Sequence, residues 1–182
     1  MRLIVGLGNP GEQYANTRHN AGFMALDEFL GGVAWTENKK FNALIHEDGD
    51  CLFVKPLTFM NDSGRSVQKI LDYYKLRPKT LGLISKKDLD LNNCLCVVHD
   101  DLDLPFGTYR LSKGSSSGGH RGVQSIIDYL KTKNFTRLRL GIKNDLLRTH
   151  IPPEKFVLQP FSREEKERLK ELNASLDLKN LK

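Results

Sequence analysis

Short apolar runs alternate with segments of helical periodicity along the whole chain, and this alternation is the strongest constraint on its fold. The strand-like runs lie at residues 3–7, 43–45, 51–54, 94–98 and 138–142, and the helical segments at 21–30, 63–74 and 122–130. No internal repeat or low-complexity linker interrupts the 182 residues. Strands alternating with helices predict a single α/β domain over 1–182, long enough to bury roughly two thirds of its unfolded surface without disulfides.

Composition and the N-terminal residues predict a soluble cytoplasmic protein. Charged residues make up 27% of the chain, and no apolar stretch approaches the roughly 20 residues that a bilayer requires. The N-terminus, Met1-Arg2 followed directly by a strand, lacks the zones of a signal peptide. Cys51, Cys94 and Cys96 show no C-x-x-C spacing and lie in apolar runs. They predict buried thiols in preference to a redox or zinc site.

Positive charge gathers in one part of the chain. The formal net charge is +6, and residues 107–150 hold nine Lys or Arg against two acidic residues, so the remainder is close to neutral. Clustered positive charge favours a polyanionic partner such as RNA, because each phosphate contact releases counterions. A solvated basic surface explains the same count equally well.

The opening stretch LIVGLGNPGEQY, residues 3–14, has the G-x-G-x-x-G spacing of a dinucleotide-binding turn. Such a turn works because a helix starts within it and aims its N–H groups at the pyrophosphate. Here Pro10 precedes the third glycine, and a helix begins only near Thr17 or later. The acidic residue expected about 20 positions on, at the end of a second parallel strand, is also missing. We interpret the glycines as a sharp turn at a strand end and expect no cofactor.

Polar side chains follow three of the predicted strands. Asn9 follows the first run, Asn61 follows the third, and HDDLD, residues 99–103, follows the fourth. Because ligands bind beyond the carboxyl ends of strands in α/β sheets, we expect these loops to converge. His19 opens the first helix. Although a lone histidine is more often structural, one beside a carboxylate that sets its tautomer is a credible general base.

Hydrolysis by an activated water fits these residues better than covalent catalysis, because the chain has no G-x-S-x-G nucleophile motif. Asparagine amides suit a carbonyl and a developing oxyanion. A metal site formed by His99, Asp100, Asp101 and Asp103 is an alternative, since imidazole and carboxylate bind metals. Adjacent residues on an extended chain point in opposite directions, which disfavours one shared ion.

Two further segments suit RNA. TFMN, residues 58–61, places Phe59 before a helix, where a partly exposed ring can stack on a base, although core packing is the default for such a ring. KGSSSGGHRG, residues 113–122, is a Gly/Ser loop entering a helix with basic residues at each end. It is either a cradle for phosphate or a mobile surface loop.

Five motifs together resemble the bacterial peptidyl-tRNA hydrolases in order and spacing: VGLGNPGEQYANTRHNAGF, KPLTFMNDSG, VVHDDLDLPFG, GGHRGVQSI and NFTRLRLGI. The resemblance runs from about Leu3 to Phe161. It implies a twisted mixed β-sheet flanked by helices and cleavage of the ester between a stalled peptide and the 3′-terminal adenosine of tRNA, without metal or cofactor. It also implies a cytoplasmic monomer that contacts the 3′ CCA end and acceptor stem and needs no obligate protein partner.

The resemblance assigns catalytic roles to three residues. His19 is implied to be the base that takes a proton from water, and Asp100 to hold it in its basic form. Asn9 is implied to sense the peptide amide and so to distinguish peptidyl-tRNA from ordinary aminoacyl-tRNA.

The resemblance also assigns binding residues. Asn61 is implied to bind substrate near the scissile carbonyl, with Tyr14 and Phe59 forming the pocket around the tRNA end. Arg121 departs from the family, which usually has Asn after the His of its GGHNG loop. A long cation there can instead grip the terminal phosphate or ribose.

Two other departures from the family concern the length of a connecting segment and the length of the C-terminal part. The segment 79–93, KTLGLISKKDLDLNN, is longer than the usual link and is expected to be a surface insertion. The chain also stops about one helix short of typical members, after a helix near 162–178 that begins with a capping box of Ser162 and Glu165, so we expect weaker tRNA affinity. A catalytically silent RNA-binding relative remains the alternative to an enzyme.

Overall fold

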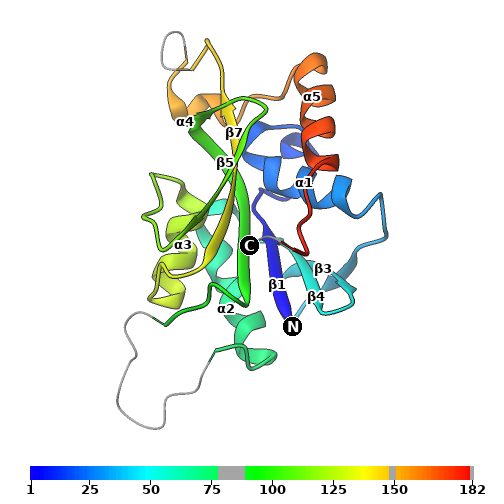
Figure 1. Ribbon diagram of the computed structural model, residues 1–182, viewed down its shortest axis with the longest axis vertical. Helices are drawn as coiled ribbons and strands as arrows, with labels where there is room; N and C mark the ends of the chain where they lie inside the picture. Colours follow the sequence, from blue (N-terminus) through cyan, green and yellow to red (C-terminus); the bar gives the residue numbers. More distant parts are fainter. Residues whose placement is uncertain (78–88, 148–150, 181–182) are drawn as a thin grey trace.

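The protein is built on one mixed β-sheet (Figure 1). The computed structural model describes residues 1–77, 89–147 and 151–180, so the predicted insertion near 79–93 lies outside the described residues except for 89–93. Within these ranges the sheet has seven strands in the order β2-β3-β4-β1-β5-β7-β6. The strands are β1 (Arg2–Gly6), β2 (Thr36–Asn38), β3 (Ala43–Asp48), β4 (Cys51–Pro56), β5 (Leu95–Pro105), β6 (Tyr109–Lys113) and β7 (Thr136–Lys143).

The centre of the sheet is parallel and its margins are antiparallel. β4, β1, β5 and β7 pair in parallel, whereas β3, β2 and β6 join as antiparallel neighbours. Leu3 and Val5 of β1 enter the core on one face and Ile4 enters the core on the other. A strand covered on both faces reads as a continuous apolar run, as the sequence shows here.

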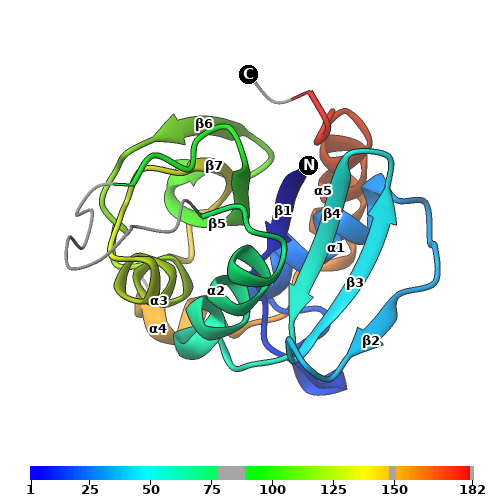
Figure 2. The same ribbon diagram turned by 90° about the horizontal axis from the view of Figure 1, so that it is seen from below.

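Helices cover both faces of the sheet. The α-helices are α1 (Ala21–Phe29), α2 (Ser63–Tyr73), α3 (Arg121–Leu130), α4 (Pro153–Phe156) and α5 (Arg163–Ala174). Three short 3₁₀ helices are η1 (Glu12–Tyr14), η2 (Arg18–Asn20) and η3 (Met60–Asp62). α2 and α3 pack together on one face, and α1 and α5 share the core of the other (Figure 2). None of the helices in the described ranges has the length and apolar character needed to cross a bilayer.

Most of the predicted elements are confirmed. Each strand-like run and each helical segment named from the sequence corresponds to a strand or helix of the structure, within a few residues. The capping box of α5 is present, and that helix ends at Ala174, short of residue 178. β2, β6 and α4 were not predicted, because they are short and their apolar periodicity is weak. Of the free cysteines, Cys51 and Cys96 are buried as predicted, and Cys94 is half-buried.

The strand expected at 94–98 is longer than predicted, and the acidic residues lie within it. β5 continues to Pro105, so the prediction that residues 99–103 form a loop after the strand is wrong. The strand continues because β7 pairs with it through Asp100 and Asp101, and Arg139 of β7 forms an ion pair with Asp101. A Cβ on Gly141 would lie 2.1 Å from the carbonyl oxygen of Pro105, so glycine permits this close approach.

The glycines of the opening loop serve packing more than turning. Only Gly11 has a positive φ, at 106°. A Cβ on Gly6 would lie 2.5 Å from the Gly22 carbonyl oxygen, and a Cβ on Gly8 would lie 2.7 Å from the Phe23 ring. The interpretation of a sharp turn therefore holds for Gly11, whereas the other two let α1 pack directly against the end of β1. This packing places His19, which lies in η2 two residues before α1, beside the strand ends.

Candidate active site

All seven predicted site residues line one cavity of about 840 Å³. They come from the loop after β1, from η1, η2 and η3, from β5 and from the start of α3, and they are Asn9, Tyr14, His19, Phe59, Asn61, Asp100 and Arg121. The volume lies within the range of roughly 300–1,000 Å³ typical of small-molecule sites. Convergence of these loops was expected, and the structure shows it.

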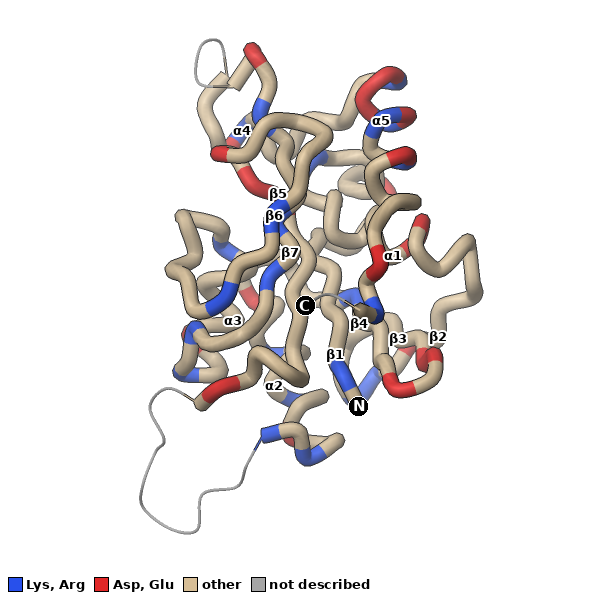
Figure 3. Tube along the Cα trace, viewed as in Figure 1, with Lys and Arg blue, Asp and Glu red and all other residues tan. Residues whose placement is uncertain are grey.

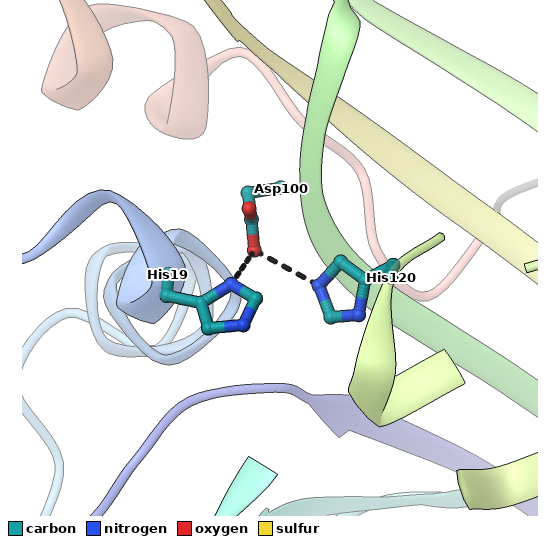
Figure 4. Close-up of side chains that lie close together, drawn as sticks. All are labelled: His19, Asp100 and His120. Carbon is teal, nitrogen blue, oxygen red and sulfur yellow. Dashed lines mark hydrogen bonds and ion pairs between the residues drawn. The ribbon is translucent and has the colours of Figure 1, made fainter. Parts of the chain in front are cut away.

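One carboxylate oxygen joins two histidines inside this cavity (Figure 4). Asp100 Oδ1 lies 2.9 Å from His19 Nδ1 and 3.0 Å from His120 Nε2. The two rings are tilted at 42° with centroids 4.8 Å apart. His120 lay within the GGHRG motif, but its role could not be read from the sequence, because it depends on a contact with a strand 20 residues away.

Hydrogen bonds to the helix set the tautomer of His120. Its Nδ1 accepts from the backbone N–H groups of Gly122 and Val123, at 3.2 and 3.3 Å, and so caps α3. A ring nitrogen that accepts carries no proton, so the proton of neutral His120 is on Nε2 and points at Asp100. Asp100 Oδ1 therefore accepts from His120, and also from Nδ1–H of His19, which leaves the lone pair of His19 on Nε2.

The site keeps Asp100 ionised and His19 basic. Burial raises the pKa of the Asp100 carboxyl, but the charges and hydrogen bonds of His19 and His120 outweigh it and hold that pKa well below its usual range. Burial lowers the pKa of His19, yet the charge and hydrogen bond of Asp100 outweigh burial and the opposing charge of Arg121, so the net shift is upward. A raised pKa makes His19 a better proton acceptor once it is neutral.

His99 lies behind the pair and stays neutral. Its Nδ1 donates to the backbone carbonyl of Asp100 at 2.7 Å, and its ring meets His120 edge to face at 4.7 Å. Burial, with the nearby charge of His120, lowers the pKa of His99 to about 3. Its Nε2 is buried without a hydrogen-bond partner among the residues that the structure describes.

The donor set suits a hydrogen-bond network better than a metal ion. Within the described residues, the His, Cys and acidic side chains close enough to share an ion are His19, Asp100 and His120, which differs from the alternative set inferred from the sequence. Metal binding at His120 would need a lone pair on Nε2, the atom that carries the proton while Nδ1 caps α3. Asp101 of the alternative set is paired with Arg139.

Hydrogen bonds fix both the main chain and the side chain of Asn9. Its N–H donates to Asn20 Oδ1 at 2.8 Å, and its carbonyl accepts from Asn20 Nδ2 at 3.0 Å. Its side-chain oxygen accepts from the Met60 N–H at 2.9 Å. With the oxygen engaged, the amide NH₂ of Asn9 is the donor that faces the cavity. Asn20, a buried residue not singled out from the sequence, therefore positions a site residue.

The wall beyond Asn9 is partly apolar. Phe59 lines the cavity and is 61% exposed, so it does not pack in the core as such a ring usually does. Asn61 beside it is exposed in η3, and Tyr14 is half-buried in η1. An exposed ring next to an exposed amide offers stacking and hydrogen bonding to one ligand.

A buried arginine shapes the Gly/Ser loop. Arg137 donates to the carbonyl oxygens of Ser115, of Ser116 at 2.6 Å and of Lys133 at 3.4 Å. Burial lowers the pKa of the Arg137 guanidinium to about 10. These bonds hold residues 115–116 at the rim of the cavity, so the loop has a defined position.

The segment 157–161 supports His19 from the other side. The N–H of His19 donates to the Val157 carbonyl at 2.8 Å, and the N–H of Arg18 donates to the Gln159 carbonyl at 3.0 Å. Val157 also lines the cavity. Sequence patterns did not mark this segment, because its role is backbone pairing with a distant part of the chain.

Three of the basic residues of 107–147, Arg121, Arg137 and Arg139, line the cavity. The whole basic set lies on β6, on β7, at the start of α3 and directly after α3 (Figure 3), and Arg110 of β6 pairs in register with Arg139 of β7. Arg148, counted in the basic segment, lies outside the described residues.

Comparisons with known proteins point to one family. The model of the peptidyl-tRNA hydrolase family matches residues 3–178. The peptidyl-tRNA hydrolase of Aquifex aeolicus is 43% identical over 171 residues, covering 91% of this chain and 80% of that protein, and that of Persephonella marina is 42% identical over 172 residues, covering 91% and 82%. The crystal structure of the Acinetobacter baumannii enzyme superposes with a TM-score of 0.76 at 31% identity, covering 94% of this chain and 82% of that one.

Proposed function

The chain belongs to the peptidyl-tRNA hydrolase family, and from this membership and the site geometry we propose that it cleaves the ester between a peptide and the 3′-terminal adenosine of tRNA with a water activated by His19. The observation that carries the proposal is the 2.9 Å contact between His19 Nδ1 and Asp100 inside the cavity. Such an ester hydrolase recycles tRNA from stalled translation.

His19 acts as general base through Nε2. As the water oxygen bonds to the ester carbonyl carbon, its proton passes to Nε2. The bond from that carbon to the ribose oxygen then breaks, and the ribose oxygen takes the proton back. Asp100 stabilises the imidazolium that exists between the two transfers, and His120 holds Asp100 in place.

Two amides position the substrate. The NH₂ group of Asn9 donates to the peptide next to the ester, which distinguishes a peptide from a free amino acid. Asn61, exposed at the cavity, binds near the scissile carbonyl and the oxyanion that develops there. Tyr14 and Phe59 form the pocket around the terminal adenosine, with the exposed Phe59 ring available to stack on the base.

The tRNA reaches the site over the basic side of the molecule. Lys and Arg on β6, on β7 and around α3 contact the CCA end and acceptor stem, chiefly through phosphates. The protein works as a cytoplasmic monomer without an obligate protein partner.

The test is release of an N-acetylated amino acid from its tRNA by wild-type protein and by His19→Ala. We expect a loss of about 10²- to 10⁴-fold in kcat for the variant, the usual contribution of a general base. His46→Ala, in β3 and outside the cavity lining, is the matched control and should keep wild-type activity.

Two further results would contradict the proposal. Tight tRNA binding by wild-type protein without any release would favour the RNA-binding alternative. Loss of release on adding 1,10-phenanthroline, which chelates transition metals while leaving the Mg²⁺ of tRNA in place, would favour a metal site.

A further inference from the structure

Arg121 is the arginine of the cavity whose guanidinium has no partner among the residues that the structure describes. Three arginines line the cavity: Arg121, Arg137 and Arg139. Arg139 Nε donates to Asp101 at 2.6 Å, and Arg137 is buried and bound by backbone carbonyls. Arg121 is exposed and forms no hydrogen bond or ion pair with residues 1–77, 89–147 or 151–180. An unpaired guanidinium beside a cavity is suited to a planar or tetrahedral oxyanion.

Arg121 also stands between two cavities. A second cavity of about 370 Å³ lies against the first turns of α3 and shares Arg121, Asn61, Ser117 and Gly119 with the catalytic cavity. A ligand that extends from one cavity into the other therefore passes Arg121. The charge of Arg121 also acts on the reacting centre. Burial lowers the pKa of His19, Asp100 raises it by more, and the charge of Arg121 is a further influence that lowers it.

We propose that Arg121 binds the phosphodiester that joins the terminal adenosine of tRNA to the preceding nucleotide, and that the second cavity receives that preceding nucleotide. The proposal rests on the proposed function, because it takes the adenosine ester to lie beside His19. The guanidinium fork matches two non-bridging phosphate oxygens.

The polar lining of the second cavity is compatible with a nucleoside. Gln124, Ser117 and Ser125 offer an amide and hydroxyl groups. Asp128 is the carboxylate in this lining, and it accepts from Gln124 Nε2 at 2.9 Å. It lies two helical turns beyond Arg121, about 10 Å along α3, so it does not oppose a phosphate at Arg121.

Two minimal substrates separate a phosphate contact from a contact at the ester. One is adenosine carrying an N-acetylaminoacyl group at its 3′ oxygen, which has no phosphate. The other is the same ester of the dinucleotide CpA, which has one phosphodiester. The rates are measured above the acidic limb of the profile, where His19 is neutral and the effect of Arg121 on its pKa does not matter. For Arg121→Gln we then expect kcat/KM on the CpA ester to fall by about 10- to 100-fold, the worth of a charge-assisted hydrogen bond, and kcat/KM on the adenosine ester to change less than about twofold.

Two control variants separate a general loss of charge from the loss of the guanidinium at position 121. Arg163→Gln removes the same charge from a side chain that is 92% exposed on α5, and it should leave both substrates unaffected. Arg121→Lys keeps the charge without the fork and should lose less than Arg121→Gln on the CpA ester. A direct binding measurement compares adenosine with adenosine 5′-monophosphate: wild type should prefer the phosphate, and Arg121→Gln should not.

Three outcomes would overturn the inference: equal losses on both esters, which place Arg121 at the carbonyl; no loss on either ester; or no preference of the wild type for adenosine 5′-monophosphate over adenosine. Wild-type protein that releases nothing from N-acetylaminoacyl-tRNA would contradict the proposed function instead, while the nucleotide titration would still test Arg121.

Discussion

Asp100 Oδ1 accepts a hydrogen bond from two imidazole rings, at 2.9 Å from His19 and 3.0 Å from His120. A buried carboxylate without such donors would be costly, so the histidines stabilise its charge while it sets their tautomers. The lone pair of His19 Nε2 and the proton of His120 Nε2 both follow from this one oxygen. At the scale of residues, the chemistry that we propose therefore depends on the negative charge of Asp100.

Replacing Asp100 by Asn tests that charge. The amide oxygen can still accept from both rings, but the electrostatic support of imidazolium is lost, so kcat should fall by about 100-fold or more. Because Asp100 raises the pKa of His19, the acidic limb of the rate profile should also move to lower pH in Asp100→Asn. The measurement is kcat/KM between pH 5 and 9.

An unchanged acidic limb in Asp100→Asn would show that Asp100 does not set the basicity of His19. Asp72→Asn, an exposed change on α2, serves as the control and should keep both the rate and the limb.

At the scale of elements, α3 links stability to the site. Its N-cap is His120, whose Nδ1 satisfies two N–H groups of the first turn and whose Nε2 contacts Asp100. β5 supplies the carboxylate of this contact. It continues past Val98, and its pairing with β7 places Asp100 and Asp101 at the site. One residue thus ends a loop, begins a helix and fixes a carboxylate on a neighbouring strand.

The variants His120→Asn and His120→Ala separate the two roles of this residue. Asn is a good N-cap but too short to reach Asp100, so His120→Asn should lose only the stability that the hydrogen bond to Asp100 contributes, about 1–3 kcal/mol. Its kcat should fall by roughly tenfold, the worth of one hydrogen bond. His120→Ala should lose about 1 kcal/mol of stability in addition. Urea unfolding and kcat measure the two effects, and wild-type kcat in His120→Asn would reduce His120 to a cap.

At the scale of the whole molecule, the site is set into a sheet whose central strands are covered on both faces. Burying His99 there holds its pKa near 3, far below its ordinary value of about 6.5. Between these two values the unfolded chain binds a proton that the folded protein does not. Stability is therefore lost as pH falls through this window and regained as it rises.

Replacing His99 by Phe removes this titration. The difference in unfolding free energy between His99→Phe and wild type should not change with pH above pH 7. Below about pH 6.5 the variant should become more stable relative to wild type, by about 1 kcal/mol per pH unit. Carboxylates such as Glu165, whose pKa burial raises but hydrogen bonds to Arg18, Ser162 and Asn144 lower overall, titrate in both proteins and cancel. Urea midpoints from pH 4.5 to 8 measure the effect. Parallel curves for the two proteins would contradict it.

The amino-acid sequence alone indicated the α/β class, the main helices and strands, the family and seven residues that share one cavity. It did so because periodicity and capping are local, and because motifs such as TRHN and HDD keep site residues at short, readable spacings. The folded arrangement was needed to establish that β5 runs through Asp100, because that extension depends on pairing with β7 some 40 residues away. It likewise decided the positions of Asn20, His120 and the segment 157–161, whose partners are distant in the chain. Such contacts leave no periodic trace, since either partner alone would look like an ordinary polar loop residue.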